Sequence, residues 1–338
     1  MGARGIADDE MDSTADPTRG QGRSGTYDVV IVGGGLAGLA AALVLGRARR
    51  SVLVVDAGHP RNKPANHAHG YLTRDGAAPL ELLTIGRDEV RRYGGEVVAG
   101  TATSLERRPA GGFHVALADG TGWHARRVLV TTGLVDELPD IPGLRERWGR
   151  DVVHCPYCFG WEIRDLPLGV LATGALAVEQ ALMWRQWSDD LILFQHAAPV
   201  PTDEQREQLA ARGIRIVEGK VAAVEVTDDR LSGIHLRSGE VVERSVLVVG
   251  PRFAVRHALL DALGVTMTEH PLGIASQVQA DATGRTAASG VWVAGNVSDV
   301  SGGVMQAASS GVTAGVAINA DLTAEETGSA VAAARLKR

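Results

Sequence analysis

The chemistry this chain can do starts from its only two cysteines, Cys155 and Cys158, which Pro and Tyr separate. Two thiols at this spacing can close a small disulfide ring and reopen it. The attacking species is the thiolate, so a setting that lowers one thiol pKa makes such a pair reactive. His154 directly precedes the first cysteine. The run therefore predicts thiol–disulfide exchange, with Cys155 and Cys158 as reacting groups and His154 as a candidate acid or base.

Three other roles for the cysteine pair stay open, namely a structural disulfide, half of a zinc site, or inert core thiols. A structural zinc site needs four ligands, and the sequence has no second Cys-x-x-Cys. His67 and His69 would have to be recruited from a distant segment, so no metal site is expected. Redox activity is the interpretation that best fits the residues between and beside the thiols.

A dinucleotide-binding signature precedes the cysteine pair. The apolar run Tyr27–Val32 is typical of a buried parallel strand, and Gly33, Gly35 and Gly38 follow it at GxGxxG spacing before an apolar pattern of helical period. Asp56 ends the next predicted strand. This context predicts a pyrophosphate bound at the helix N-terminus and a ribose hydroxyl bound by Asp56.

The last part of the chain favours a bound flavin. A predicted strand, Val291–Ala294, leads into Gly295 and Asn296, and a helix is expected to begin at Gly303 and Val304. The Asn296 side chain could contact a ribityl chain, and the positive end of the helix dipole could stabilise charge on a reduced flavin. On these residues alone, an ordinary strand, loop and helix closing a sheet explains the segment equally well.

Between these segments lies a weakened copy of the first nucleotide unit. Its strands are predicted at Leu168–Ala172 and Leu191–Phe194. Aligning the two halves places Ala172, Gly174 and Ala177 where the first unit has its three glycines, so the copy keeps one of them. A Cβ at position 172 would hinder the close backbone approach that a phosphate requires.

Composition excludes several classes of function. The chain has 338 residues, is 45% hydrophobic and carries a net charge of −6, so it offers no basic surface for nucleic acid. Its apolar runs are shorter than the ~20 residues that cross a bilayer. Acidic residues stand where a signal peptide would need a basic and then an apolar segment, which predicts a cytoplasmic protein without a membrane anchor.

The order of these motifs resembles the low-molecular-weight thioredoxin reductases over residues 27–322. Three strings narrow the resemblance to one group within this family. They are His-Cys-Pro-Tyr-Cys-x-Gly-Trp-Glu, which ends at Glu162, His-Ala-His-Gly, which ends at Gly70, and Leu-Thr-Arg-Asp-Gly, which ends at Gly76. These strings are similar to the dithiol oxidases that close disulfides in gliotoxin-type and holomycin-type natural products. The resemblance implies that Cys158 lies against the flavin C4a, that Cys155 exchanges with a substrate thiol, and that the protein is a homodimer.

The expected fold class is α/β, with two Rossmann-like dinucleotide-binding domains in which an NAD(P)H-like domain is inserted into the FAD domain, as in low-molecular-weight thioredoxin reductases. The cysteine pair belongs to the inserted domain. The expected division is a disordered tail over 1–26, the FAD domain over 27–138 and 273–322, the NAD(P)H-like domain over 139–272, and a C-terminal tail over 323–338.

The chain departs from the reductases at two further places. Phe159 stands where the reductases carry an Asp and the oxidases often a His, so protons must be handled elsewhere, with His154 and Glu162 the nearest candidates. Gln195, His196 and Ala197 replace the His-Arg-Arg cluster that holds the NADPH 2′-phosphate. Without guanidinium forks the bidentate phosphate contacts are lost, so NADPH binding is expected to be weak or absent.

These features predict an FAD-dependent dithiol oxidase that forms a disulfide in a small sulfur-containing metabolite and passes the electrons to O2. Two alternatives remain open. One is an NADPH-dependent thioredoxin reductase with unusual cofactor contacts, and the other is a flavin-binding accessory protein of a biosynthetic pathway without turnover of its own.

Overall fold

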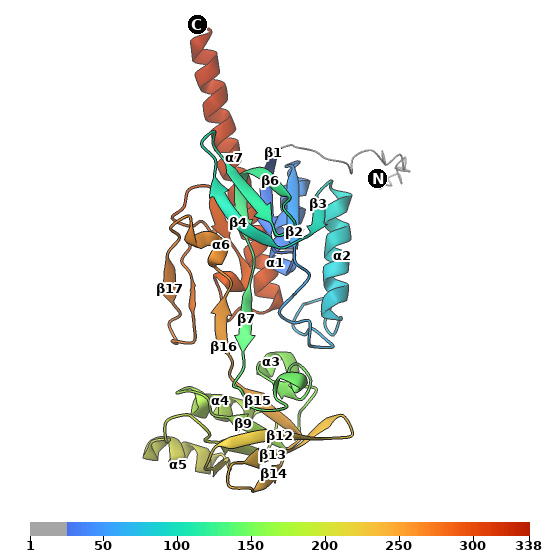
Figure 1. Cartoon of the computed structure of the whole chain (residues 1–338), viewed down its shortest axis with the longest axis vertical. Coiled ribbons are helices and arrows are strands. Elements are labelled where there is room, and N and C mark those ends of the chain that lie inside the picture. Colours follow the sequence, from blue (N-terminus) through green and yellow to red (C-terminus); the bar gives the residue numbers. More distant parts are fainter. Residues whose placement is uncertain (1–25) are drawn as a thin grey trace, which may run out of the picture.

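The computed structural model of the protein describes residues 26–338. The tail predicted over residues 1–26 lies outside the described residues, except for Thr26, which begins the first strand. The described chain forms two α/β units stacked end to end, with two strands running between them (Figure 1). Each unit is built around parallel strands, as the two predicted strand–helix–strand motifs require.

The first unit contains the larger sheet. Its strand order is β3-β2-β1-β6-β5-β4, and β19 pairs with the end of β6. The pairings β1–β2, β1–β6, β2–β3 and β6–β19 are parallel, whereas β4 and β5 extend β6 as an antiparallel meander. The strands are β1 (Thr26–Val32), β2 (Val52–Asp56), β3 (Glu96–Ala99), β4 (Ala102–Arg107), β5 (Phe113–Leu117), β6 (Gly122–Val130) and β19 (Val291–Val293).

Helices cover one face of this sheet and the meander covers the other. Val29 and Ile31 of β1 are buried among the helices, and the residues that alternate with them are buried against the meander. The helices α1 and α7 pack closely, because a Cβ on Gly311 would lie 2.0 Å from the carbonyl oxygen of Ala37. The three helices are α1 (Leu36–Arg47), α2 (Pro79–Arg92) and α7 (Val304–Leu336).

The second unit has a five-stranded parallel sheet in the order β11-β10-β9-β15-β8. Every residue of β9, β10 and β15 is buried, as expected for strands covered on both faces. Two helices cover one face, and a small antiparallel sheet covers the other. The elements are β8 (Val152–Val153), β9 (Leu168–Leu171), α4 (Ala177–Trp184), β10 (Leu191–Phe194), α5 (Asp203–Ala211), β11 (Arg215–Val217), β12 (Val221–Thr227), β13 (Arg230–Leu236), β14 (Val241–Glu243) and β15 (Val246–Val249).

The chain leaves the first unit along β7 (Leu134–Glu137) and returns along β16 (Arg252–Val255), and these strands pair antiparallel (Figure 1). After β16 come α6 (Ala258–Asp261), β17 (Met267–Glu269) and β18 (Ser276–Val278). Leu260 of α6 is buried in the core of the first unit. The boundary predicted between 139–272 and 273–322 is therefore wrong, because Leu259, Leu263 and Met267 also pack on this core.

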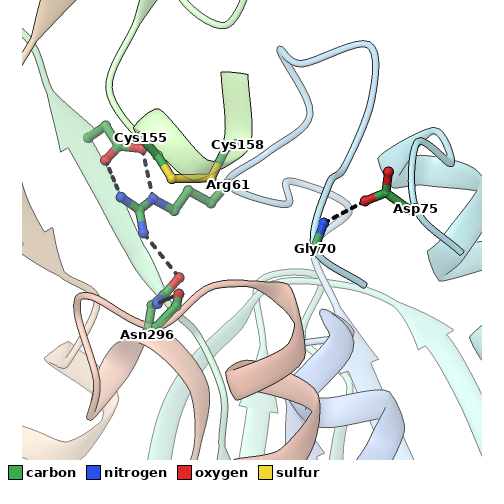
Figure 2. The surroundings of a disulfide bond; sticks show 8 residues. Arg61, Gly70, Asp75, Cys155, Cys158 and Asn296 are labelled. Atoms are coloured by element: carbon green, nitrogen blue, oxygen red, sulfur yellow. Dashed lines mark hydrogen bonds and ion pairs between the residues drawn. A yellow bond between two sulfur atoms is a disulfide. The ribbon is translucent and has the colours of Figure 1, made fainter. Parts of the chain in front are cut away.

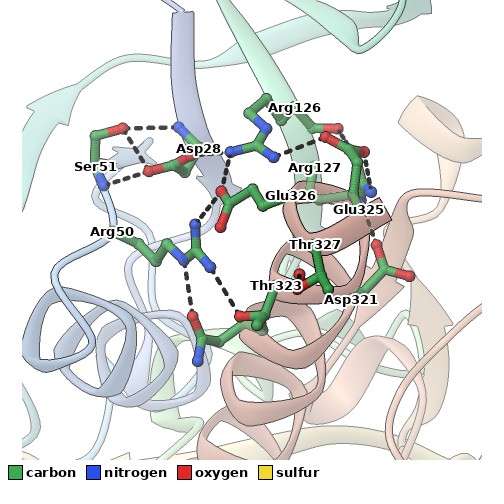
Figure 3. A network of polar contacts seen from close by, with 11 residues as sticks. Asp28, Arg50, Ser51, Arg126, Arg127, Asp321, Thr323, Glu325, Glu326 and Thr327 are labelled. Atoms are coloured by element: carbon green, nitrogen blue, oxygen red, sulfur yellow. Dashed lines mark hydrogen bonds and ion pairs between the residues drawn. The ribbon is translucent and has the colours of Figure 1, made fainter. Parts of the chain in front are cut away.

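The C-terminal helix is also longer than predicted. A tail was expected over residues 323–338, but α7 continues to Leu336 and projects from the body of the first unit (Figure 1). Arg126 and Arg127 of β6 bind Glu325 at 2.7 and 2.6 Å, and Arg50 binds Glu326 at 2.5 Å (Figure 3). Hydrogen bonds from Arg50 and then Arg126 lower the pKa of Glu326 to about 2. These ion pairs hold the start of the extension, at Glu325 and Glu326, against the sheet, and the rest of the helix projects beyond it.

The predicted α/β class with two Rossmann-like units is confirmed. The remaining short elements are the 3-10 helices η2 (Arg145–Arg147) and η3 (Gly295–Val297) and the helix α3 (Pro156–Phe159). Over residues 26–338, no helix has both the length and the apolar character that crossing a membrane requires.

Candidate active site

The two cysteines form a disulfide at the N-terminus of α3. Cys155 caps this helix, and Pro156 occupies its first position, where the missing N–H costs nothing. The Cys155 carbonyl accepts hydrogen bonds from the N–H groups of Cys158 and Phe159, both at 3.2 Å. The two Cα atoms lie 5.2 Å apart, within the normal range for a disulfide. One helical turn therefore presents both sulfur atoms together.

Aromatic side chains surround this turn. Trp187 packs directly on it, since a Cβ on Gly160 would lie 2.6 Å from the Trp187 Nε1. The ring of Tyr157, between the cysteines, meets Trp187 edge-on with centroids 5.8 Å apart. Tyr157 remains 75% exposed and Trp161 68% exposed. The disulfide is thus bordered by apolar surface that solvent reaches, which could accept an organic substrate.

His154 is placed beside the disulfide in a setting that keeps it neutral. Its ring meets Phe253 of β16 edge-on with centroids 5.4 Å apart, and its Nδ1 is buried without a hydrogen-bond partner among residues 26–338. Burial, and next the charge of Arg61, lowers the pKa of His154 to about 4. Such an imidazole is a weak base at neutral pH, so this geometry favours packing over proton transfer.

Arg61 connects the predicted flavin segment with the strand that leads to the disulfide. Its guanidinium binds Asp136 of β7 bidentately at 2.9 and 2.7 Å and donates to the Oδ1 of Asn296 at 3.2 Å (Figure 2). It also lies 4.9 Å from the ring centroid of Phe253. The sequence analysis did not identify Arg61 or Asp136 as site residues. The two are 75 positions apart, and no motif near either one predicts their contact.

The first glycine motif has the geometry that a dinucleotide needs. Gly33 has φ 114, and a Cβ there would lie 2.4 Å from the carbonyl oxygen of Thr131. A Cβ on Gly38 would lie 2.0 Å from the Gly33 carbonyl oxygen. Gly35 caps α1 and faces open space, and the helix has no side-chain cap and no acid in its first turn. The free N–H groups and open approach fit the pyrophosphate of FAD.

Asp56 lies at the end of β2, where an adenosine ribose is expected. Its Oδ1 accepts from the N–H of Gly58 at 3.2 Å, and its Oδ2 accepts from Arg87 of α2 at 3.1 Å. These bonds orient the carboxylate beside the glycine motif, since a Cβ on Gly34 would lie 2.7 Å from it. The carboxylate therefore lies at the strand end beside the glycine motif, and its bond to a ribose stays a prediction.

The predicted flavin segment meets this motif directly. A Cβ on Gly295, which has φ 73, would lie 3.0 Å from the Cβ of Ala37 in the first turn of α1. The Asn296 Nδ2 donates to the carbonyl oxygens of Asp299 and Gly302, each at 2.8 Å. These bonds shape the loop that precedes α7.

The start of α7 matches that of α1. Gly303 caps the helix, Val304 is its first residue, and neither a side-chain cap nor an acid occupies its first turn. The fold thus brings together the residues predicted to bind FAD, with two helix N-termini open in the same unit. These are Gly33, Gly35, Gly38, Asp56, Gly295, Asn296, Gly303 and Val304.

The corresponding turn of the second unit lacks this cradle. Gly174 aligns with Gly35. Helix α1 begins at the residue after Gly35, whereas α4 begins at Ala177, the third residue after Gly174, and thus starts two residues later. The carbonyl oxygen of Ala172 instead accepts from the N–H groups of Ala197 and Ala198 at 3.2 and 3.1 Å. The segment after β10 is therefore bonded to the end of β9.

The residues that replace the phosphate-binding cluster also have other roles. The Nδ1 of His196 accepts from the N–H of Val221 at 3.1 Å, and burial, with the charges of Lys220 and Arg237, lowers the pKa of His196. A cavity of about 160 Å³ remains at this edge, and no Lys or Arg is among its described lining residues. A phosphate would find little charge there.

No group of three or more metal-ligating side chains occurs in the described part of the chain. In the structure the cysteines bind each other, and His69 contacts two carboxylates.

Comparison with known proteins gives consistent results. The sequence profile described as pyridine nucleotide-disulphide oxidoreductase matches residues 27–315. The crystal structure of HlmI superposes with a TM-score of 0.87 at 47% identity, covering 93% of this chain and 98% of that one. An oxidoreductase from Agrobacterium tumefaciens superposes with a TM-score of 0.83 at 35% identity, covering 88% and 99%. Thioredoxin reductase sirT of Leptosphaeria maculans is 30% identical over 310 residues, which are 87% of this chain and 93% of the relative.

Proposed function

Because the chain belongs to the pyridine nucleotide-disulphide oxidoreductase family and is a thioredoxin-reductase-like flavoenzyme, we propose that it oxidises a small dithiol to a disulfide and passes the electrons to O2. One observation carries the direction of electron flow. The FAD motif and the cysteine pair are complete, whereas the second nucleotide turn keeps one of three glycines and no Lys or Arg is among the described residues that line its cavity. A dithiol is then the electron donor that the remaining site can accept.

The reaction follows from the disulfide. A substrate thiolate attacks Cys155, the bond between Cys155 and Cys158 breaks, and Cys158 leaves as a thiolate. The second substrate thiolate attacks the substrate sulfur bonded to Cys155, which closes the product disulfide and releases the Cys155 thiolate. Two thiol protons are lost. The two helix N-termini would hold FAD, which would supply a two-electron acceptor for the cysteine pair and a route to O2, and the two electrons and two protons would yield hydrogen peroxide.

The surface beside the disulfide supports a small organic substrate. Tyr157 and Trp161 expose flat apolar surface on the same turn as the sulfur atoms. Such side chains provide contact area with few rotatable bonds, which favours a compact apolar molecule.

The test is turnover of a small dithiol by the FAD-loaded enzyme in air, with peroxide as the readout. Cys155→Ser should reduce peroxide formation to background, because the attacked sulfur is gone. Cys158→Ser should also stop turnover, because no disulfide remains for the substrate to attack. Mixed with the disulfide form of the substrate, its Cys155 thiolate should instead displace one substrate thiolate and keep a mixed disulfide that intact-protein mass spectrometry detects. Val241→Ala, on an exposed strand of the second unit, serves as the matched control. Unchanged turnover in Cys155→Ser would contradict the mechanism.

The alternative is a thioredoxin reductase, and Lys220 and Arg237 near His196 are the observation in its favour. Anaerobic mixing separates the two functions. Under the proposed function a dithiol bleaches the bound flavin faster than NADPH does at equal concentration. Faster bleaching by NADPH would establish the reductase direction instead.

A further inference from the structure

A closed loop of the first unit reaches the turn that carries the disulfide. Ala68 and Ala77 form a bridge in which the Ala68 N–H donates to the Ala77 carbonyl at 2.9 Å, and the Gly76 N–H donates back to Ala68 at 3.0 Å. Inside this loop the Gly70 N–H donates to the Oδ1 of Asp75 at 2.8 Å (Figure 2). The loop backbone is thus fixed by its own hydrogen bonds.

His69, within this loop, lies between two carboxylates. Its Nδ1 is 3.2 Å from the Oδ2 of Asp75, and its Nε2 is 3.4 Å from the Oε1 of Glu162 in the second unit. The side chain of His69 is 20% exposed, while those of Asp75 and Glu162 are 65% and 41% exposed. The imidazole is therefore the least exposed of three side chains in contact, and the two carboxylates on either side of it are exposed to solvent.

Glu162 connects these three side chains to the segment that carries the reactive sulfur atoms. It follows Cys158 by four residues, in a turn after α3 where the N–H groups of Glu162 and Ile163 donate to the Phe159 carbonyl at 3.1 and 3.2 Å. Phe159, which directly follows the second cysteine, offers no acid or base.

The contact with Asp75 favours one tautomer of His69. Hydrogen bonds from the Gly70 N–H and then from His69 lower the pKa of Asp75. This carboxylate is therefore ionised and accepts a hydrogen bond from the Nδ1–H of His69. The Nε2 then faces an oxygen of Glu162. In the tautomer that carries its proton on Nδ1, the Nε2 is an acceptor and can take up a proton. His67 is the other titratable group beside the ring, with centroids 6.3 Å apart.

We propose that His69 and Glu162 accept the thiol protons during dithiol oxidation and that Asp75 is the positioning residue that holds His69. As each substrate thiol attacks, its S–H proton passes to the free Nε2 or to Glu162 and then to water. The sulfur electron pair forms the new S–S bond, and the pair of the broken bond remains on the leaving cysteine. The inference rests on the proposed function in taking a dithiol as substrate.

The test measures how fast dithiothreitol reduces the enzyme as a function of pH, under anaerobic conditions. Flavin bleaching is one readout. The other is the number of N-ethylmaleimide adducts per chain in quenched samples, which reports opening of the disulfide independently of the flavin. The variants are His69→Gln and Glu162→Gln, with His67→Gln as the matched control in the same loop.

We expect His69→Gln to slow both readouts by on the order of 10²-fold at neutral pH, with smaller loss in Glu162→Gln and none in His67→Gln. The deficit should close at high pH, where the dithiol ionises without a base. Added imidazole should restore part of the rate in His69→Ala. The proposal that His69 and Glu162 accept the thiol protons, called the proton relay below, is overturned by either of two results. One is a His69→Gln rate of reduction equal to wild type at neutral pH, and the other is a loss of rate that stays unchanged at high pH.

Two outcomes distinguish failure of the proton relay from failure of the proposed oxidase function. If the pH-dependent deficit is found but the reduced enzyme passes no electrons to O2, the relay stands and the oxidase function fails. If peroxide forms normally in His69→Gln at neutral pH, the oxidase function stands and the relay fails.

Discussion

Gly35 and Gly38 lie three residues apart in the first glycine motif, yet their surroundings differ. A Cβ at Gly35 meets nothing within 4 Å, whereas a Cβ at Gly38 would lie 2.0 Å from a carbonyl oxygen. We expect Gly35→Ala to fold but to bind FAD at least about tenfold more weakly, because the new methyl group occupies the pyrophosphate approach. Gly38→Ala should lower the stability of the FAD-free chain by about 1–3 kcal/mol.

Flavin content after purification and thermal unfolding of the FAD-free chain measure the two effects separately. A normal flavin content in Gly35→Ala would show that the pyrophosphate does not bind over this helix N-terminus.

At the scale of elements, the extension of α7 beyond Leu322 depends on partners in β6 and near β2. A chain that ends at Glu326 keeps Glu325 and Glu326, whereas one that ends at Leu322 loses both. The longer truncation should lower the thermal midpoint by about 2–4 °C, because Arg126 and Arg127 lose carboxylate partners. The shorter one should leave it unchanged.

Thermal unfolding at low and high salt checks this prediction. Salt should narrow the difference between the two truncations, since screening weakens exposed ion pairs. Equal midpoints at low salt would mean that the ion pairs do not stabilise the first unit.

At the scale of the whole molecule, His154 lies where the two units join, against Phe253 of the returning strand. Burial lowers its pKa to about 4, so the unfolded chain binds the proton more readily than the folded chain. The stability from the neutral imidazole is thus fully present above pH ~6.5 and is lost as the pH falls toward 4, by up to about 3 kcal/mol.

Thermal unfolding across this pH window, in wild type and His154→Phe, measures the contribution. The variant should lose the part of the pH dependence that His154 causes, while other groups contribute equally to both proteins. The same slope in both proteins would show that His154 does not titrate in this window.

The sequence predicted those parts of the fold that depend on neighbours in the chain. The glycine motif lies next to the strand and helix that it joins, so its role can be read locally. The boundary at residue 272 was wrong, because apolar residues such as Leu260 show that a segment is buried but not on which sheet. The helix end at Leu322 was wrong because its stabilising partner, Arg126, lies on a distant strand.

The same limit applies to the site. The cysteine pair and Glu162 could be identified from spacing and resemblance. The contact of Glu162 with His69 joins the two units, and the contact of Arg61 with Asp136 joins a loop to a connecting strand. Such pairs arise only when the sheets have formed, so no local pattern predicts them.

The packing of Trp187 on the turn of Cys155 and Cys158 has a practical consequence. Its indole lies against Gly160 and meets the ring of Tyr157, between the cysteines. An excited indole readily loses its emission to a nearby disulfide, and opening that bond removes the quencher. The chain therefore carries an intrinsic optical reporter of its sulfur oxidation state, which can be followed in protein stripped of its yellow cofactor.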